Sequence, residues 1–283
     1  MVHPPPSITA RLGGWARAAR TAVLRLLGPA ERAYRRLRGR PELPPLWLRR
    51  HVGPVRHFET AARDMVAFLD RRELVRTGDL VVDLGCGCGA MTPALEERVG
   101  DEGRYLGIDV HGPSIRWCRE HWGREQRRGE DRIRFERAAM ASPYATDEAM
   151  GEAAGEAGDF AAGYRIPAAA GSAGLVLAKS LFTHLLEDQA APYLAEIHRL
   201  LEPGRRAVIT AFLFAEAPPA FPHGEGPVRW RRAARPQAAV AYHRPYFEAL
   251  VAAAGLEVVE VVTGFWPGTD RPPTGQDVLV LER

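Results

Sequence analysis

Lysine is almost absent from this 283-residue chain: Lys179 is the only one, and every other residue among its 38 basic positions is arginine. Together with 28 glycines and 23 prolines, this preference indicates a GC-rich coding sequence, which is a compositional cause rather than a function. The 35 acidic residues leave a net charge of only +3. A charge this small does not by itself indicate nucleic-acid binding.

Cysteine is scarce as well, with only Cys86, Cys88 and Cys118. Three cysteines do not make a disulfide framework, so we expect a protein of the reducing cytoplasm. The Cys-x-Cys pair at 86 and 88 suggests metal as an alternative. Both residues lie in a glycine-rich stretch, however, and no His or Cys cluster completes a set of four ligands. We therefore expect no metal site.

Long apolar runs are missing too, and none is long enough to span a bilayer. The hydrophobic fraction of 46% is typical of a globular chain with a sizeable core. The length fits one large domain, or one domain with an appendage.

The most informative stretch covers residues 80–91 and reads LVVDLGCGCGAM. Its first half is a short apolar run, typical of a strand buried on both faces of a parallel sheet. Gly85, Gly87 and Gly89 follow at every other position, and glycine lets a backbone turn sharply and approach a ligand without a Cβ in the way. From Met91 the pattern becomes helical. The stretch therefore predicts strand, glycine turn and helix, with a ligand at the helix N-terminus.

The spacing of these glycines separates two kinds of ligand. A dinucleotide fold uses G-x-G-x-x-G, whose helix N-terminus holds a pyrophosphate. This chain has G-x-G-x-G, and Asp83 precedes the first glycine by two residues. An acid at that point suits a positively charged amine better than phosphates. An ordinary strand-to-helix turn without a ligand is the alternative.

The pattern Asp-x-Gly-x-Gly-x-Gly resembles the first motif of class I S-adenosylmethionine-dependent methyltransferases. The resemblance implies that Gly85 and Gly87 line the methionine part of the cofactor, and that Asp83 organises the loop near its amino group. Cys86 and Gly89 belong to the same loop, and we include them among the candidate cofactor-binding residues.

A second buried strand is predicted over 103–110, and it ends in Asp109 and Val110. An acid at the end of the second strand of a doubly wound sheet sits where it can bind a pair of ribose hydroxyls. The alternative is an N-cap for the helix that starts at Pro113. Val110 and Lys179, the latter at the end of the fourth predicted strand, complete this group of candidate cofactor-binding residues.

The third predicted strand, with its exit, covers 132–140. Related methyltransferases usually have an Ala-Asp pair here, whose acid or backbone meets the adenine. This chain has Ala138 and Ala139 instead. We therefore expect backbone groups at Ala139 and apolar contact from Met140 to hold the adenine ring.

Residues 175–214 resemble the bacterial small-molecule methyltransferases that read Ser-x-Phe-Thr-His-Leu, then a helix, then Leu-x-Pro-Gly-Gly. The chain departs from that pattern twice. Arg205 replaces the second glycine, and Ala173 and Gly174 replace the usual Phe-Asp before the fourth strand. The second change removes an acid that normally helps to anchor the start of that strand.

His184 is the candidate catalytic residue, because it follows the fourth strand closely. That strand's carboxyl end faces the transferred methyl group in this fold. Histidine titrates near neutral pH and can accept a hydroxyl proton as the oxygen attacks. The alternative is a structural loop residue whose ring is bonded to backbone. His243 is the reserve candidate.

The predicted fold is a doubly wound, seven-stranded, mostly parallel sheet with helices on both faces and an antiparallel last strand, as in class I methyltransferases. We assign the methyltransferase domain to 58–283, with a low-complexity insertion at about 145–173. Residues 1–57 form a basic helical extension and a proline-rich linker. The segment 11–27 has the pattern of a basic amphipathic helix, which can lie on a membrane surface. Packing on its own domain or on a partner is the alternative that we favour.

The predicted function is methyl transfer from S-adenosylmethionine to a small-molecule acceptor, with a hydroxyl oxygen as our first choice. Nucleic acid is not expected, because the loop after the fourth strand lacks the Asn/Asp-Pro-Pro-Tyr pattern of enzymes that methylate amino groups of bases. Two alternatives stay open. One is a nicotinamide-dependent oxidoreductase, and the other is a non-catalytic cofactor-binding protein, suggested by the missing acids at Ala139 and Gly174.

Overall fold

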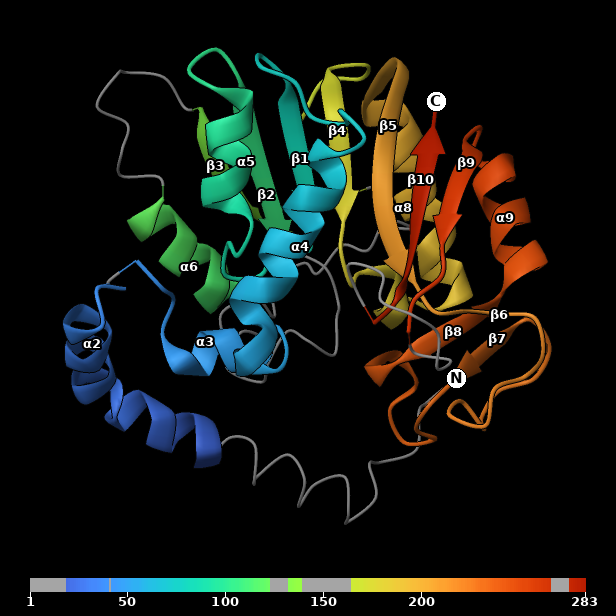
Figure 1. The fold of residues 1–283 in the computed structure, drawn as a ribbon. Coiled ribbons are helices and arrows are strands. Elements are labelled where there is room, and N and C mark those ends of the chain that lie inside the picture. The colour runs from blue at the N-terminus through green and yellow to red at the C-terminus, as the bar shows by residue number, and fades with distance from the viewer. Residues whose placement is uncertain (1–18, 41, 123–131, 139–163, 266–274) are drawn as a thin grey trace.

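The computed structural model describes residues 19–40, 42–122, 132–138, 164–265 and 275–283. A seven-stranded sheet forms its centre, in the order β3-β2-β1-β4-β5-β10-β9 (Figure 1). Strands β3, β2, β1, β4 and β5 are parallel, and β10 is antiparallel to both β5 and β9. The seven strands are β1 Leu80–Leu84, β2 Arg104–Asp109, β3 Ile133–Arg137, β4 Ala173–Ala178, β5 Leu201–Ala211, β9 Glu257–Val262 and β10 Asp277–Glu282. The predicted fold class is confirmed.

Each face of the sheet has its own hydrophobic core, because successive strand residues point to opposite sides. Val81 and Val82 are both fully buried, yet they belong to different clusters. The Val82 cluster contains residues of α8 (Glu187–Leu200) and α9 (Arg244–Ala253). The Val81 cluster contains residues of α3 (Leu46–His51), α4 (Phe58–Asp70), α5 (Thr92–Val99) and α6 (Gly112–His121). The sheet is therefore covered on both sides, as a parallel sheet requires.

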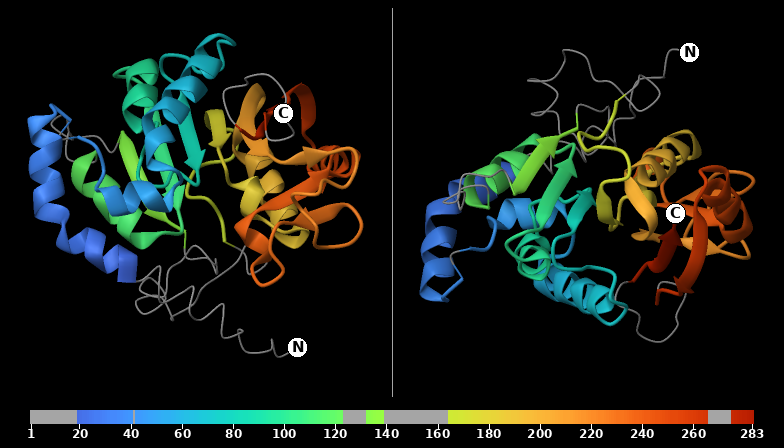
Figure 2. Two further views of the ribbon diagram at one scale, coloured as in Figure 1. Left: turned by 60° about the horizontal axis from the view of Figure 1, so that its bottom comes forward. Right: turned by 90° about the horizontal axis from the view of Figure 1, so that it is seen from above.

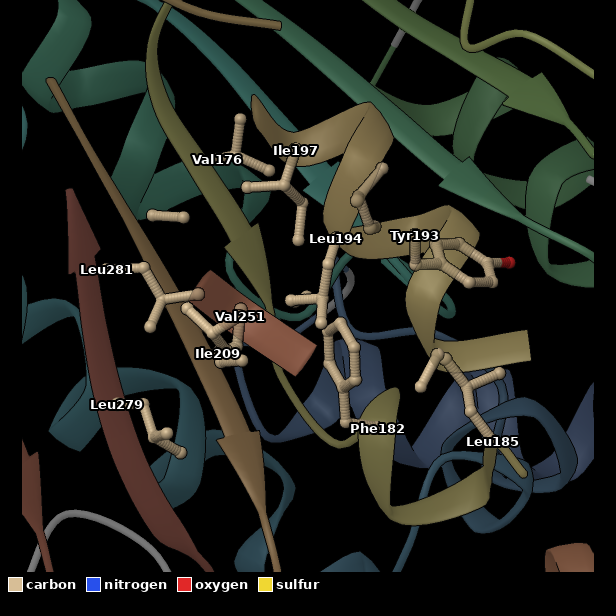
Figure 3. Packing of buried hydrophobic residues seen from close by; sticks show 14 of the residues in the cluster. Val176, Phe182, Leu185, Tyr193, Leu194, Ile197, Ile209, Val251, Leu279 and Leu281 are labelled. Carbon is tan, nitrogen blue, oxygen red and sulfur yellow. The ribbon is translucent and has the colours of Figure 1, made fainter. Parts of the chain in front are cut away.

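Figure 3 shows the Val82 cluster from close by: Leu194 and Ile197 of α8 lie near Val176 of β4, and Val251 of α9 lies beside Ile209 of β5 and Leu281 of β10. Phe182, the first residue of the short 3₁₀ helix η4 (Phe182–His184) after β4, is fully buried within it and meets the ring of Phe247 edge-on at 5.7 Å between centroids. The end of the loop after β4 is thus anchored in the core. That anchoring holds the residues that follow it in one place.

The order of the strands reverses next to β1. Chain order runs outward through β2 and β3 on one side and through β4 and β5 on the other. In open α/β sheets, ligands bind outside the carboxyl ends of the strands at such a switch point. The glycine-rich stretch follows β1, so it lies at this crevice.

The two departures from the family pattern near β4, at Arg205 and Gly174, lie next to each other in the structure. Arg205 forms an ion pair with Asp79, which lies just before β1, and both side chains are largely buried. A Cβ at Gly174 would collide with the Asp79 carboxylate and come within 2.7 Å of Arg205. Asp79 thus supplies an acid close to the position where the family pattern has Asp and this chain has Gly174. We expect Asp79 to take the place of the missing acid.

A second, three-stranded sheet lies beside the carboxyl end of the main one, in the order β6-β8-β7 (Figure 2). Its strands are β6 Leu213–Phe214, β7 Val228–Trp230 and β8 Val240–His243. The sequence patterns predicted neither β7 nor β8. Each of these strands is four residues or fewer, too short to show a period-two pattern.

The N-terminal part contains a helix over 19–26, then α2 (Gly28–Leu37), and then α3. Residues 11–18 of the predicted amphipathic helix lie outside the described residues. Leu48 of α3 is fully buried in the same core as α4. The boundary between 1–57 and 58–283 stays a prediction. Within the described part of the chain, no helix combines the length and apolarity that crossing a membrane needs.

Candidate active site at the carboxyl end of the sheet

A cavity of about 1140 Å³ opens at the carboxyl ends of β1, β2 and β4. This volume exceeds the usual upper range for a single ligand pocket, about 1,000 Å³, so the cavity has room for a cofactor and an acceptor together. We call one part the loop end; it is lined by Gly85, Cys86, Gly87, Asp109 and Val110. We call the other part the histidine end; it is lined by Tyr164, His184, Gln189, Tyr193 and Gln237.

The glycine loop has the backbone that its spacing predicted. Gly85, Gly87 and Gly89 all have positive φ angles, of 78°, 56° and 75°. Side chains are strained in that region, so these positions favour glycine. A Cβ on Gly87 would also collide with Val52, and one on Gly89 would lie 2.8 Å from Trp122 Nε1. Gly85 and Gly87 line the cavity, whereas Gly89 packs against Trp122 and does not.

Asp109 holds this loop in place. One carboxylate oxygen accepts a hydrogen bond from the Gly87 N–H at 2.8 Å, and the other accepts from the His111 N–H at 2.7 Å. His111, not Asp109, occupies the N-cap position of α6. Burial raises the pKa of Asp109, while these backbone N–H groups oppose the rise. The acid therefore ties the loop end together and still lines the cavity. Its contact with a ribose stays a prediction.

Asp83 lies beneath the loop and not in the cavity wall. Its side chain is almost fully buried, and one of its oxygens accepts a hydrogen bond from Tyr105 Oη at 2.7 Å. The other oxygen has no hydrogen-bond partner among the described residues. Burial raises the pKa of Asp83 to about 7, against the opposing effects of Tyr105 and Lys179. Its role in organising the loop and its contact with a cofactor amine both stay predictions.

Lys179 lies at the end of β4 and lines the cavity. Burial lowers its pKa, while the charge of Asp83 opposes that shift. A cationic side chain in the cavity can meet an anionic group of a ligand. The other two candidate cofactor-binding residues, Ala139 and Met140, lie outside the described residues.

The three cysteines gather around the loop as buried free thiols. The Sγ atoms of Cys86 and Cys118 both lie 3.7 Å from the Gly87 carbonyl oxygen. Burial raises the pKa of Cys86 well above its ordinary value, which keeps the thiol protonated. Among the described residues, no group of three or more His, Cys, Asp or Glu could hold a metal ion.

His184 ends a short 3₁₀ helix, η4 (Phe182–His184), and lines the histidine end of the cavity. Its Nδ1 lies 3.0 Å from the Gln237 carbonyl oxygen. Burial lowers the pKa of His184, and the Gln237 and Ala238 backbones oppose the shift. A carbonyl only accepts, so Nδ1 carries the proton in this contact. The ring is thus bonded to backbone, as the structural alternative predicts, and it also faces the cavity, as the catalytic one requires.

The loop between β4 and η4 carries backbone strain. Ser180 has a φ of 61°, which is uncommon for a residue other than glycine. Its N–H donates to Thr210 Oγ1 at 2.7 Å, and the Thr183 hydroxyl donates to the Ser180 carbonyl oxygen at 3.0 Å. Such strain persists where the surroundings hold it, often at functional sites. Ser180 lines the cavity, so the strain lies at the wall of the site.

Several residues of the histidine end were not predicted. Gln237 donates to Gln189 Oε1 at 2.6 Å, which links η5 (Pro236–Ala238) to α8. Neither glutamine belongs to a motif, and they are far apart in the chain, so no local signal could have identified them. His243, the reserve candidate base, is not among the lining residues of the cavity.

The family model described as a methyltransferase domain matches residues 82–209. Among curated proteins, an uncharacterized RNA methyltransferase of Streptomyces coelicolor is 34% identical over 82 residues, which cover 29% of this chain and 17% of that protein. The match therefore spans less than a fifth of that relative's length.

Two solved structures show how the fold is shared. The mitomycin 7-O-methyltransferase MmcR is 16% identical, with a TM-score of 0.51 over 95% of this chain and 67% of its own. The cyclase SpnF is also 16% identical, with a TM-score of 0.50 over 78% of this chain and 81% of its own. At such identities the likeness concerns the fold alone.

The matched domain covers β1 with its glycine loop, the acid at the end of β2, and β4 with His184. The seven strands have the order and directions of the class I methyltransferase sheet. The resemblance that the first motif indicated is thereby confirmed. Residues 82–209 therefore carry a methyltransferase domain with the class I fold, whose cofactor is S-adenosylmethionine.

Proposed function

We propose that this chain methylates a hydroxyl oxygen of a small-molecule acceptor. The observation that carries the proposal is the single cavity of about 1140 Å³ that joins the loop end to the histidine end. A cofactor bound at the loop end leaves space beside His184 for a second molecule. The two would then share one cavity, as direct transfer between them requires.

The loop end suits S-adenosylmethionine in its shape and its polar groups. Positive φ angles at Gly85 and Gly87 remove side chains from the surface where the ligand would lie. The Asp109 carboxylate can accept hydrogen bonds from ribose hydroxyls, since each oxygen keeps a second acceptor site. The Lys179 ammonium can meet the carboxylate of the methionine part. When bound, the cofactor supplies a methyl group that is already activated by its sulfonium.

The enclosure of the cavity favours a small acceptor. Val52, His57 and Phe58, which lie after α3 and at the start of α4, line it on one side. Gln237 from η5 lines it on another and is hydrogen-bonded to α8. A polymer would need an open groove, whereas a small molecule can be enclosed on several sides.

His184 is the proposed general base. In the neutral ring with its proton on Nδ1, the second ring nitrogen carries the lone pair. Burial lowers the pKa of His184, which favours this neutral form at neutral pH. With cofactor and acceptor bound, that nitrogen would take the acceptor's hydroxyl proton as the methyl group leaves the sulfonium for the acceptor oxygen, with S-adenosylhomocysteine as the other product. The Gln237 carbonyl holds the ring and stabilises the cation that results, because it accepts from Nδ1–H.

RNA is the second candidate acceptor, since the curated relative with 34% identity over 82 residues carries that name. That our chain does not act on nucleic acid stays a prediction. It depends on the enclosed cavity and on the absence of the Asn/Asp-Pro-Pro-Tyr pattern after β4.

The deciding experiment is to incubate the full chain with cofactor labelled in the methyl group, in two arms. One arm contains a metabolite extract and the other total RNA, and mass spectrometry locates the label. We expect label in a small molecule as a methyl ether. Label only in RNA would contradict the acceptor class.

Binding is measured separately, so that an inactive preparation is not mistaken for a wrong cofactor. Calorimetry should show heat with S-adenosylmethionine and none with reduced nicotinamide dinucleotide. Gly87→Val is the matched control, because its side chain would collide with Val52 at a position of positive φ. Binding without label transfer in either arm would favour the non-catalytic alternative. Heat with the nicotinamide alone would favour the oxidoreductase.

A further inference from the structure

The helical run at the N-terminal side of the domain has its apolar stripe turned outward. Five of the eight exposed large hydrophobic side chains in the described residues lie here, and they are 53–86% exposed. They are Val23, Leu26, Leu27, Tyr34 and Leu37. Ala30, which is also exposed, Tyr34 and Leu37 recur every three or four residues and so share one face of α2, while Val23 and Leu26 have the same spacing in the helix over 19–26 and Leu27 lies between the two helices. We call these six residues the outer stripe.

The opposite face, which is turned toward the domain, is largely polar. Thr21, Leu24, Gly28, Glu31 and Arg35 have the same helical spacing and are partly or fully buried. Glu31 is bound by Arg35 and by Arg49 of α3, with both ion-pair distances at 3.0 Å. The run thus attaches to the domain through the Glu31–Arg49 ion pair and leaves its apolar face exposed. This is the reverse of what an ordinary surface helix does.

The outer stripe is bordered by positive charge. Arg20, Arg32, Arg36 and Arg38 are all exposed, and the only acid among residues 19–40 is Glu31, which lies on the inner face. The Arg25 guanidinium lies over the Trp47 ring of α3, 4.4 Å from its centroid. The surface therefore presents leucines, a valine and a tyrosine within a border of arginines (the α2 helix is seen at the lower left of Figure 1).

The charges decide between the occupants that an apolar stripe could have. A second copy of this chain would bring the same arginines face to face, and like charges at close range repel. An anionic lipid surface offers an apolar layer for the exposed hydrophobic side chains and negative charge above it for the arginines. We propose that the outer stripe binds an anionic membrane surface, with the helices lying in the plane of the interface.

In this arrangement the leucines enter the boundary between headgroups and acyl chains, and the long arginine side chains reach the phosphates. Tyr34 suits the interface, since it has an apolar ring and a polar hydroxyl. The run leads into α3, and His51 and Val52 at the end of α3 line the active-site cavity. The surface that binds the membrane is therefore directly connected to one wall of the site.

The test is sedimentation of the full chain with vesicles of phosphatidylcholine alone and of phosphatidylcholine mixed with phosphatidylglycerol. We expect binding to the mixed vesicles, weakened by salt. Leu37→Glu should lower the affinity by about tenfold or more, as expected for a lost buried leucine. Val259→Glu is the matched control, because Val259 is an exposed apolar residue on β9, and it should leave binding unchanged.

Three results would overturn the proposal. The first is no binding to mixed vesicles, or equal binding to both kinds. The second is a dimer in light scattering that Leu37→Glu dissociates, which would assign the outer stripe to a second copy. The third is a marked drop in melting temperature for Leu37→Glu but not Val259→Glu, which would assign it to packing within the chain. The paired change Arg32→Glu with Arg36→Glu should abolish the preference for mixed vesicles.

Discussion

At the loop end of the cavity, the residues that matter come from two neighbouring strands and lie close together in the chain. Gly85 and Cys86 donate their backbone N–H groups to the Ile108 carbonyl oxygen at 2.8 and 3.0 Å, and Gly87 donates to Asp109. At the histidine end, His184 contacts the backbone of Gln237, more than fifty residues away. The loop end is held by hydrogen bonds between the ends of the adjacent strands β1 and β2, whereas the histidine end depends on a contact between elements much farther apart in the chain.

This difference should separate the effects of mutations. A change at the histidine end should affect turnover and leave cofactor affinity alone. A change at the loop end should affect affinity first. The following predictions test that separation, from the largest expected effect to the smallest.

The largest effect is expected for His184 at the histidine end. His184→Ala and His184→Gln should lower turnover by roughly 10²–10⁴-fold, the usual contribution of a general base. Affinity for S-adenosylmethionine should be almost unchanged, because the residue lies apart from the glycine loop. The measurement is kcat with the identified acceptor, together with calorimetry of cofactor binding.

The pH profile distinguishes a base from a structural histidine. Burial lowers the pKa of His184, so the wild-type rate should rise with pH below 6.5 and then level off as the ring loses its proton. Variants without the base should lose that limb of the profile. A turnover loss under tenfold with an unchanged profile would return His184 to a structural role.

The ion pair at the other end of the sheet should affect stability only. Asp79→Asn leaves the largely buried Arg205 without its charge partner, which we expect to cost about 3 kcal/mol of unfolding free energy. Chemical denaturation measures this cost. Cofactor affinity should be unchanged, because the pair lies at the amino end of β4, away from the loop.

A rescue variant makes the same prediction sharper. In an Asp79→Ala background, Gly174→Asp places a carboxylate where the family pattern has one, beside Arg205. The double variant should regain part of the lost stability. If it is less stable than Asp79→Ala alone, Asp79 is not the replacement for the missing acid.

The same contrast explains what could be predicted from the sequence. The seven strands and the glycine loop follow from short-range patterns, because the buried strands need apolar runs and the turns need positive φ. The Asp79–Arg205 pair, the Gln189–Gln237 contact and the small sheet with β7 depend on residues far apart in the chain. No local pattern encodes such contacts. The motif at 180–185 predicted where His184 would lie, but not which backbone would hold it.

Two buried titratable groups beneath the loop end should give opposite pH effects on stability. Burial lowers the pKa of His111 to about 3, so acid favours the unfolded chain, and stability falls as pH drops below about 6.5. Burial raises the pKa of Asp83 to about 7, so stability rises as pH drops from about 7 toward about 4. At pH 5, each contribution amounts to about 2 kcal/mol relative to pH 7.

The two contributions nearly cancel in the wild type, so variants are needed to reveal them. Asp83→Asn should make the chain lose stability between pH 7 and pH 5, and His111→Gln should make it gain stability over the same interval. His51 stacks on His111 with 3.8 Å between the ring centroids, and burial lowers its pKa as well. It therefore contributes a pH dependence of the same sign as that of His111. Urea denaturation at both pH values measures the change. Equal pH dependence in wild type and both variants would contradict the opposing pair.

The smallest effect is expected at Asp109, where the acid already serves the protein itself. Both of its oxygens accept backbone N–H groups, so Asp109→Asn should keep one of these bonds and lose the other. We expect about a tenfold loss of affinity for S-adenosylhomocysteine, close to 1.4 kcal/mol. The wild type should bind a 2′-deoxyribose analogue more weakly than it binds S-adenosylhomocysteine. The Asp109→Asn variant should bind the two compounds about equally. That pattern would assign the loss to a ribose contact. If the analogue loses the same affinity in both proteins, Asp109 acts only by holding the loop. The two ends of the cavity would then differ in geometry rather than in ligand contact.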